Sequence, residues 1–206
     1  NYPELYFLNY VLFHRTNDEE IKPCRTYFWK KIKDKVQGKA MVEAALEINH
    51  WCAGEVMYQG TDMRTGSALE IYRSGVGRCG EEAVFVVNVM RSAGIPARPV
   101  YVPRWSHCDD NHAWVEVWCD GDWHYLGACE PEAVLDKGWF TNAASRAMMI
   151  GSRWYDRAMP DEKVIGKDGM NRIINLLGKY AKTRWITITV EDLDGTPAAG
   201  AKVRAE

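Results

Sequence analysis

The sequence lacks the features that would assign it to several common classes of protein. Its 26 Lys and Arg residues are balanced by 28 Asp and Glu residues, and the net charge of −2 argues against nucleic-acid binding. The longest nearly unbroken apolar run, residues 83–90, is too short to cross a membrane. With 206 residues, 47% of them hydrophobic, the sequence predicts a folded domain with a large core.

Metal-binding motifs are missing as well. The six cysteines include no Cys-x-x-Cys pair, and no two histidines have the i, i+4 spacing of a helical metal site. We therefore expect no metal and no cofactor, and we interpret His107 and His124 as solvated loop residues. Cys119 and Cys129 flank a predicted hairpin, and the sequence does not decide whether they form a disulfide.

Helical patterns dominate the first half of the chain. Apolar residues spaced by three and four predict helices over residues 25–36 and 40–57. Ser67 followed by Glu70 is the capping box of a short third helix. Residues 79–93 leave almost no polar face and are followed by a glycine and then a proline, which predicts a helix that is buried nearly all round.

Strand patterns follow the helices. Residues 97–102, 112–119 and 123–126 are predicted strands, and a turn that contains glycine joins the last two. Residues 147–154 are a further candidate strand, whereas residues 168–181 are weakly helical. Helices followed by antiparallel strands are typical of the α+β class.

A separate strand pattern begins near the end of the chain. Ile186, Ile188 and Val190 alternate with polar residues, and a turn at residues 192–197 leads to a second strand. Two strands cannot bury a sandwich face, so we expect residues 184–206 to be the truncated start of a β-sandwich domain. This hairpin resembles the start of carboxypeptidase-regulatory-like, Ig-like modules. The resemblance implies further C-terminal domains and a bacterial protein that is secreted or lies in the cell envelope.

A cysteine stands where a glycine-rich turn enters the buried helix. Unpaired N–H groups at a helix N-terminus favour a thiolate over a thiol and can donate to an oxyanion, so Cys79 is a candidate nucleophile. Gly77 and Gly80 allow close approach of a substrate to the backbone, which makes them candidate substrate-binding residues. Taken alone, Cys79 could instead have a structural role, as a small buried residue that fits a tight turn.

A histidine opens the most regular predicted strand. Alternation places His112, Trp114 and Glu116 on one face of that strand. A histidine at this edge can lie beside a helix N-terminus, where a neutral imidazole accepts a thiol proton and later returns it to a leaving group. Taken alone, His112 could instead be a surface or hairpin residue whose hydrogen bonds are satisfied and which has no catalytic role.

The two motifs together resemble the transglutaminase-like superfamily of papain-like cysteine enzymes. The Gly-Arg-Cys-Gly-Glu motif around Cys79 is followed, 33 residues after the cysteine, by the His112 strand. The local likeness is to the peptide N-glycanase core, which also has a counterpart of Ala128-Cys129-Glu130. The resemblance covers roughly residues 40–140 and implies a papain-like fold within a domain of residues 1–183. It also implies that Cys79 is the nucleophile and His112 the general base and acid.

The third catalytic position departs from the family pattern. The family has an Asp that orients the histidine, and this sequence has Gly127 there. Glu130 could reach back to the histidine, another polar group could replace the Asp, or the site could be weak or inactive. We favour Glu130, and capping of a helix that starts near Pro131 is the alternative role for this residue.

Two tryptophans complete the candidate substrate-binding residues. Trp51 could donate its indole N–H to an oxyanion, with a core position on a helix as the alternative. Trp105 lies in the loop before the histidine strand and is a candidate wall of a groove.

Several functions fit the resemblance. The leading hypothesis is thiol-dependent acyl transfer or hydrolysis of an amide bond in a peptide, protein or glycopeptide. We favour hydrolysis over cross-linking because the sequence lacks the calcium sites and extra domains of animal transglutaminases. It also lacks the zinc-binding cysteine pairs of eukaryotic N-glycanases. The alternatives are an inactive transglutaminase-like module that binds peptide or carbohydrate, and a region that only holds a neighbouring sandwich domain.

Overall fold

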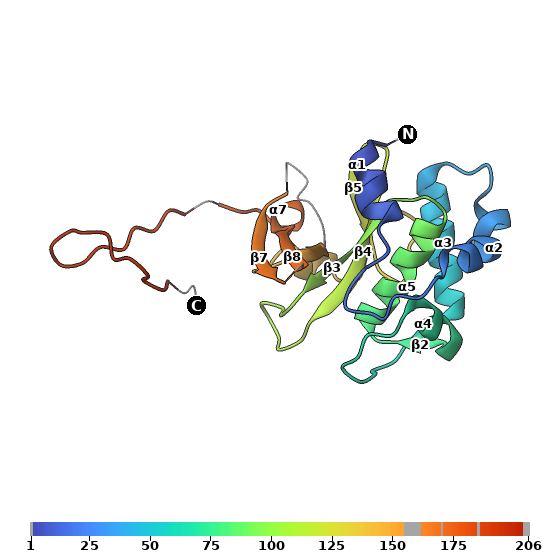
Figure 1. Cartoon of the computed structure of the whole chain (residues 1–206), viewed down its shortest axis with the longest axis horizontal. Helices are drawn as coiled ribbons and strands as arrows, with labels where there is room; N and C mark the ends of the chain where they lie inside the picture. Colours follow the sequence, from blue (N-terminus) through green and yellow to red (C-terminus); the bar gives the residue numbers. More distant parts are fainter. Residues whose placement is uncertain (1, 155–161, 170, 185, 204–206) are drawn as a thin grey trace.

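The elements follow the predicted α+β order, with helices first and an antiparallel sheet after them (Figure 1). The computed structural model describes residues 2–154, 162–169, 171–184 and 186–203. The helical elements are α1 (Glu4–Phe7), the π-helical turn η1 (Leu8–Leu12), α2 (Arg25–Val36), α3 (Met41–Glu55), α4 (Ala68–Ser74), α5 (Cys79–Ser92), α6 (Thr141–Ala144) and α7 (Leu177–Tyr180). The strands are β1 (Met57–Tyr58), β2 (Val76–Gly77), β3 (Ala97–Val102), β4 (His112–Cys119), β5 (Asp122–Leu126), β6 (Gly151–Trp154), β7 (Val164–Asp168) and β8 (Asn171–Asn175).

The predicted helices are confirmed with small changes at their ends. α2 has the predicted bounds, and α3 lies within the predicted residues 40–57. Ser67 caps α4, because its hydroxyl accepts from the Glu70 N–H at 3.4 Å and Glu70 Oε2 accepts from the Ser67 N–H at 2.9 Å. This pair is the capping box expected from the sequence.

One antiparallel sheet of six strands, in the order β5-β4-β3-β6-β8-β7, carries the rest of the fold. β3 pairs with β4 as far as its last residue, Val102, which lies opposite His112, the first residue of β4. β5 returns from β4 through Asp120 and Gly121, whose φ angles of 52° and 97° form the predicted turn. β1 and β2 form a separate parallel pair just before α5.

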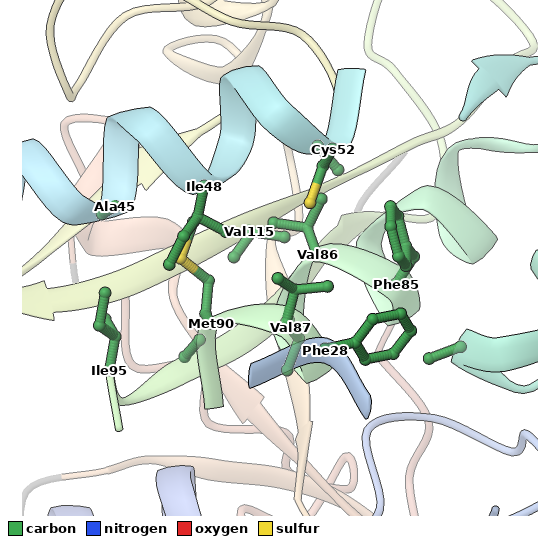
Figure 2. Close-up of a cluster of buried hydrophobic side chains, with 14 of the residues drawn as sticks. Phe28, Ala45, Ile48, Cys52, Phe85, Val86, Val87, Met90, Ile95 and Val115 are labelled. Atoms are coloured by element: carbon green, nitrogen blue, oxygen red, sulfur yellow. The ribbon is translucent and has the colours of Figure 1, made fainter. Parts of the chain in front are cut away.

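α5 is enclosed on its sides, as its composition predicts. Ten of its 14 residues are buried, and it packs against β3 and β4 on one side and against α2, α3 and α4 on the other. Figure 2 shows Val86 and Val87 of α5 in one buried cluster with Ile48 of α3 and Val115 of β4. The chain then leaves the helix through Gly94, whose φ of 77° suits glycine. The enclosure fixes the first turn of α5 against the beginning of β4.

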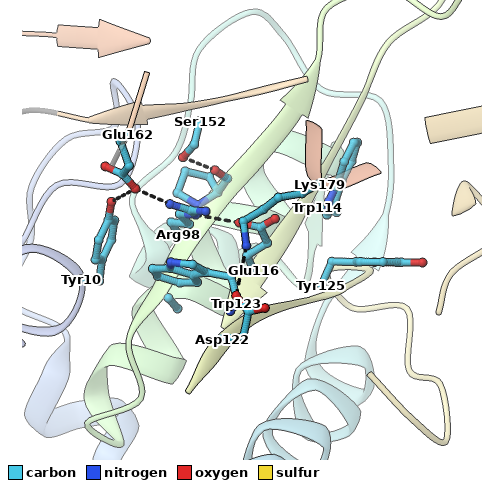
Figure 3. A network of polar contacts seen from close by, with 12 residues as sticks. Tyr10, Arg98, Trp114, Glu116, Asp122, Trp123, Tyr125, Ser152, Glu162 and Lys179 are labelled. Atoms are coloured by element: carbon cyan, nitrogen blue, oxygen red, sulfur yellow. Dashed lines mark hydrogen bonds and ion pairs between the residues drawn. The ribbon is translucent and has the colours of Figure 1, made fainter. Parts of the chain in front are cut away.

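A buried polar network fixes the other face of the sheet (Figure 3). The Arg98 guanidinium of β3 donates to Glu116 Oε2 of β4 at 2.7 Å and to Glu162 Oε1 at 2.6 Å. The Tyr180 hydroxyl donates to Glu116 Oε1 at 2.6 Å and accepts from the Trp114 indole N–H at 2.9 Å. These paired hydrogen bonds offset the desolvation of the buried charges. β4 is therefore held on both faces.

The strand predictions become less accurate toward the C-terminus. The strands at residues 97–102 and 112–119 are confirmed, and the candidate strand at residues 147–154 shortens to β6. The weak helix expected over residues 168–181 is wrong, because β8 occupies its first half and α7 is a single turn. β8 contains two isoleucines and lies between β6 and β7, and such pairing overrides a weak helical preference.

The C-terminal tail does not form the predicted strands. Residues 186–203 extend away from the sheet in Figure 1, and no strand is assigned within them. A single antiparallel bridge between Glu191 and Pro197 closes the predicted turn. Ile186 and Ile188 are 79% and 60% exposed, because a lone hairpin has no sheet against which to bury its apolar face. That residues 184–206 begin a sandwich domain stays a prediction.

The contrast between core and tail can be tested with one kind of substitution at two sites. Ile48→Ala should lower the free energy of unfolding by about 2–5 kcal/mol, because truncation leaves a cavity between α3 and α5. The matched control Ile188→Ala should change it by less than about 0.5 kcal/mol. Denaturant titration of the two variants measures both values. Equal losses would contradict the placement of one residue in the core and of the other in solvent.

Candidate active site

Cys79 is the first residue of α5 and lies beside the start of β4. The backbone N–H groups of Gly80 and of Ala113 in β4 lie close enough to its sulfur to lower the pKa of the thiol. The chain reaches it through β2, in which Gly77 is buried. A Cβ added to Gly77 would lie 3.1 Å from the Cβ of Glu81, so glycine allows the turn to pack tightly against the helix.

Glu81 holds this turn from behind. Its carboxylate accepts from the backbone N–H of Arg78 at 3.2 Å, from that of Gly66 at 3.0 Å and from the Thr61 hydroxyl at 2.5 Å. These bonds join the loop over residues 61–66 to the N-terminus of α5. Sequence reasoning missed this role, although a Glu three residues after a helix N-cap is the spacing of a capping box.

His112 lies among aromatic rings at the start of β4. Its ring centroid is 4.7 Å from that of Trp139, and Trp105 stacks beside it at 6.4 Å. Nε2 of His112 faces Glu130 Oε2 at 3.9 Å, and neither atom has a hydrogen-bond partner among the described residues. The ring nitrogen that remains for the Cys79 thiol is Nδ1.

Glu130 occupies the space that a side chain at position 127 would need. Its N–H donates to the carbonyl oxygen of Gly127 at 3.2 Å, and the two residues form an antiparallel bridge. A Cβ built on Gly127 would lie 2.8 Å from the Glu130 Cβ and 3.2 Å from its Cδ, and it would overlap Oε2. No helix starts at Pro131, because α6 begins only at Thr141, so helix capping by Glu130 is excluded.

Two side chains that the sequence did not single out hold this turn. Trp139 donates its indole N–H to Glu130 Oε1 at 3.0 Å, which leaves Oε2 directed toward the histidine. Asn49 of α3 donates to the carbonyl oxygen of Gly127 at 2.9 Å and accepts from the Cys129 N–H at 3.0 Å. Cys129 has a φ of 57°, which is rare outside glycine, so the Asn49 bonds stabilise a strained backbone.

Cys79 and His112 line the same cavity, of about 250 Å³. Its walls come from the first turn of α5, from β3, from the beginning of β4 and from β6. Gly80, a predicted substrate-binding residue, also lines it. The structure thus places the cysteine and the histidine on one cavity, with the Glu130 carboxylate behind the histidine.

The other predicted substrate-binding residues lie outside the cavity lining. Trp51 stacks on Tyr72 with ring centroids 6.0 Å apart and packs against the core around α5, because its helix turns that face inward. Trp105 is 5% exposed, stacks beside His112 and lines a separate hollow formed by the loop before β4, so its role as a groove wall stays a prediction. Gly77 is buried beneath the turn that leads to α5.

Burial controls the protonation of the two central groups. It raises the pKa of the Cys79 thiol more than the surrounding N–H groups lower it. It also lowers the pKa of His112 to about 4, although the charge of Asp110 opposes this shift. The expectation that the helix N-terminus yields a thiolate is therefore wrong for the resting site. At neutral pH, a thiol lies beside a neutral imidazole.

Burial acts on two nearby carboxyl groups as well. It raises the pKa of Glu130, while the hydrogen bond from Trp139 lowers it. It raises the pKa of Glu82, which is 4% exposed, to about 8, and the charge of Glu130 adds to this shift. Glu82 is therefore a neutral acid at pH 7, and the negative charge of the pair resides on Glu130.

The other cysteines and histidines have structural surroundings of their own. Cys119 and Cys129 are free thiols and form no disulfide. His124 is not a solvated loop residue, because it lies in β5 with its Nδ1 at 2.6 Å from Asp136 Oδ2.

Within the described ranges, no three His, Cys, Asp or Glu side chains gather as a metal site. Nor does any described helix have the length and apolar character to cross a bilayer.

Comparison with known proteins gives one family match and several distant structural matches. Residues 30–128 match the model of the transglutaminase-like superfamily, whereas no curated protein matches the chain. A candidate cysteine protease from Cytophaga hutchinsonii is 19% identical, with a TM-score of 0.43 over 74% of this chain and 57% of that one. A candidate protease from Parabacteroides distasonis is 17% identical, with a TM-score of 0.46 over 62% of this chain and 25% of that one. LapG of Legionella pneumophila is 17% identical, with a TM-score of 0.43 over 54% of this chain and 66% of that one.

This chain therefore spans less than two thirds of the length of each of those three proteins. The family match itself runs from α2 to the end of the turn after β5 and includes both Cys79 and His112 in the predicted elements. Residues 30–128 are therefore a core of the transglutaminase-like superfamily, with the α+β architecture of the papain-like kind.

Proposed function

We propose that the protein hydrolyses or transfers an acyl group from an amide bond, with Cys79 as nucleophile and His112 as base and acid. Glu130 would orient the imidazole in place of the family's Asp. One observation carries this proposal: Glu130 fills the space beside Gly127 and faces His112, which lines one cavity with Cys79. The superfamily match supports a thiol-dependent hydrolase or acyltransferase.

The resting protonation states set the order of the chemical steps. Neutral His112 accepts the thiol proton at Nδ1 while the Cys79 sulfur bonds to the amide carbon, and the carbonyl electron pair moves onto oxygen. Glu130 stabilises the imidazolium from the Nε2 side. When the C–N bond breaks, the imidazolium gives its proton to the leaving amine, and a thioester remains. Water then attacks the thioester with His112 as base, which releases a carboxylic acid and the thiol.

Backbone groups around the sulfur suit stabilisation of the oxyanion. The N–H groups of Gly80 and Ala113 both point at Cys79. A carbonyl carbon bonded to the sulfur brings its oxygen close to the same donors, where a developing negative charge is stabilised. This set requires no indole donor, which agrees with the position of Trp51 in the core.

A non-catalytic module that binds peptide or carbohydrate is the second candidate function. The specific observation in its favour is the 3.9 Å separation between His112 Nε2 and Glu130 Oε2, which exceeds hydrogen-bond length. The raised pKa of the Cys79 thiol also favours it, because a thiol is a poor nucleophile. The two functions differ in what substrate binding does to this gap. In an enzyme, His112 Nε2 and Glu130 Oε2 come within hydrogen-bond distance when substrate binds, whereas in a binding module they stay apart.

The substrate and the location follow from weaker observations. A peptide, protein or glycopeptide amide fits a superfamily of this chemistry, and hydrolysis is preferred over cross-linking. The resemblance of residues 184–206 to the start of a sandwich module supports further C-terminal domains and a secreted or cell-envelope protein. A complete gene that encodes no export signal would overturn the proposed location.

The catalytic roles can be tested by alkylation of Cys79 with iodoacetamide, followed by peptide mapping. His112→Ala should slow the reaction at neutral pH by about 10²-fold, because the thiol loses its base. Glu130→Gln should slow it by roughly tenfold, because the amide keeps the shape but not the charge that raises imidazole basicity. The matched control Glu132→Gln removes a carboxylate that pairs with Lys137 and should leave the rate unchanged. Slow labelling that is indifferent to His112 would favour the binding module.

The replacement of the family's Asp can be tested by moving the carboxylate back. Gly127→Asp alone should lower stability, because its Cβ overlaps the Glu130 carboxylate. The double variant Gly127→Asp with Glu130→Ala should remove the clash and restore most of the alkylation rate that Glu130→Ala loses. Thermal melting and alkylation kinetics measure the two effects. A double variant that folds but reacts like Glu130→Ala would refute the orienting role.

The protonation state of Cys79 predicts a specific pH profile. Its raised pKa means that the thiolate fraction at neutral pH is smaller than that of an ordinary thiol. The alkylation rate should therefore rise through the alkaline range, with its midpoint above the ordinary value of 9.0. The exposed Cys108 serves as an internal reference for the reagent. An alkaline midpoint at or below 9.0 would contradict the raised pKa of the Cys79 thiol.

Glu82 predicts how stability depends on pH. Its pKa is about 8 in the folded protein and 4.5 when unperturbed, so the folded state holds the proton more strongly. Stability should therefore fall as the pH rises from 4.5 to 8, because only the unfolded chain releases the proton over this range. Glu82→Gln should flatten this part of the profile, as measured by urea unfolding at several pH values. An unchanged slope in the variant would assign the pH dependence to other groups.

A further inference from the structure

The cavity beside Cys79 has an uneven distribution of charge. Two arginines, Arg78 and Arg153, are among its lining residues, and no Asp or Glu is among those that the structure describes there. The rest of the lining is neutral, with asparagine amides and with apolar side chains from β3 such as Val100 and Val102. The described wall therefore carries positive charge only.

Arg78 is held at the cavity by neutral groups. Its Nη2 donates to the Thr65 hydroxyl at 3.0 Å and to the carbonyl oxygen of Arg64 at 3.2 Å. Its Nη1 lies over the first turn of α5, at 2.6 Å from where a Cβ of Gly80 would be. The glycine thus makes room for the guanidinium, which forms no ion pair with a described carboxylate, although the charge of Asp62 lies within electrostatic range of it.

Arg153 approaches the cavity from β6. Its Nη1 donates to Asn17 Oδ1 at 2.6 Å, and its guanidinium carbon is 5.9 Å from the ring centroid of Tyr101. An amide oxygen and an aromatic ring orient a guanidinium without neutralising it. The two arginines come from separate places in the fold, the residue before α5 and β6, and both border the cavity that contains the Cys79 thiol.

We propose that this cavity binds a carboxylate of the substrate, close to the amide bond that Cys79 attacks. Guanidinium groups recognise carboxylates through paired N–H donors, and a partly enclosed, mainly apolar wall strengthens that attraction. The neutral state of His112 leaves the two arginines as the cations at the described wall. The inference rests on the proposed function, because it uses the nucleophile to place the ligand. It adds the substrate class, an amide that carries a neighbouring carboxylate.

The positive wall can be measured with two reagents of similar size. Iodoacetate and iodoacetamide both transfer a two-carbon group to the Cys79 sulfur with loss of iodide, and only iodoacetate carries a carboxylate. The ratio of their rates at Cys79, divided by the same ratio for a short cysteine peptide, should exceed one in the whole chain. High salt should bring this ratio toward the peptide value.

Substitutions assign the preference to particular residues. Arg153→Ala should lower the normalised ratio by about twofold to fivefold, and Arg153→Lys should retain most of it. The matched control Arg104→Ala removes an exposed arginine that pairs with Asp109 outside the cavity lining, and it should leave the ratio unchanged. Arg78→Gln, which also removes a positive charge and should also lower the ratio, provides the second cavity variant if Arg153→Ala does not fold. A wild-type ratio at or below one, or a ratio that neither cavity variant changes, would overturn the proposal.

Short peptides distinguish the two sources of a carboxylate. Acetyl-Ala-Glu-Ala-amide carries it on a side chain, acetyl-Ala-Gln-Ala carries it at the C-terminus, and acetyl-Ala-Gln-Ala-amide carries none. Protection of Cys79 from iodoacetamide by the first peptide identifies an acidic side chain, and protection by the second identifies a terminal carboxylate. Equal protection by all three peptides, or none by any, would overturn carboxylate binding.

Failure of this inference differs from failure of the proposed function. Rapid alkylation that depends on His112 but shows no preference for iodoacetate would retain the catalytic proposal and reject the carboxylate site. Slow alkylation that ignores His112 would reject the catalytic proposal. The ratio of the two reagents would still be measurable at alkaline pH, where the thiolate of Cys79 forms.

Discussion

The site depends on the enclosure of α5. An apolar helix that packs against the sheet on one side and against α2, α3 and α4 on the other cannot shift without exposing much apolar surface to water. Its first residue is Cys79, and the pairing of β3 with β4 extends to His112 at the edge of the same sheet. The core itself therefore fixes where the residues that carry the sulfur and the imidazole lie, and the Ala113 N–H of β4 is close enough to the sulfur to lower the pKa of the thiol.

The same burial gives the site its resting chemistry. Removing water from Cys79 and His112 disfavours both of their charged forms, and the N–H groups at the helix N-terminus are too few to reverse this effect on the thiol. In the proposed mechanism, charge separation therefore occurs together with substrate attack, when the oxyanion donors and Glu130 would act on the charges that form. A protonated Glu82 fits this scheme, because a second carboxylate near Glu130 would be costly in so small a buried space.

The sequence could predict what local patterns specify. Helix periodicity, the Ser67 capping box and the bounds of β4 depend on neighbouring residues, and the order of the cysteine and histidine motifs placed both residues correctly in their elements. Asn49 could not be found in this way, because it contacts the turn at residues 127–129 from about 80 positions away and shows no periodicity of its own. The sign of the pKa shift at Cys79 was missed for a related reason. It depends on how deeply the tertiary structure buries the sulfur, and the sequence motif reveals only the helix N-terminus.

The exchange between Gly127 and Glu130 shows which property of the third position matters. An Asp on a strand is short and has few rotamers, so the strand alone can aim it, whereas a Glu from a turn has one more rotatable bond and loses more entropy when it is fixed. Here the indole of Trp139 restrains the Glu130 carboxylate, and Asn49 restrains the backbone that carries it. The missing side chain at position 127 is then a requirement of the arrangement, because any Cβ there would displace the carboxylate. A carboxylate in the right place, supported by groups that limit its motion, is the constraint, and the sequence position that supplies it can change.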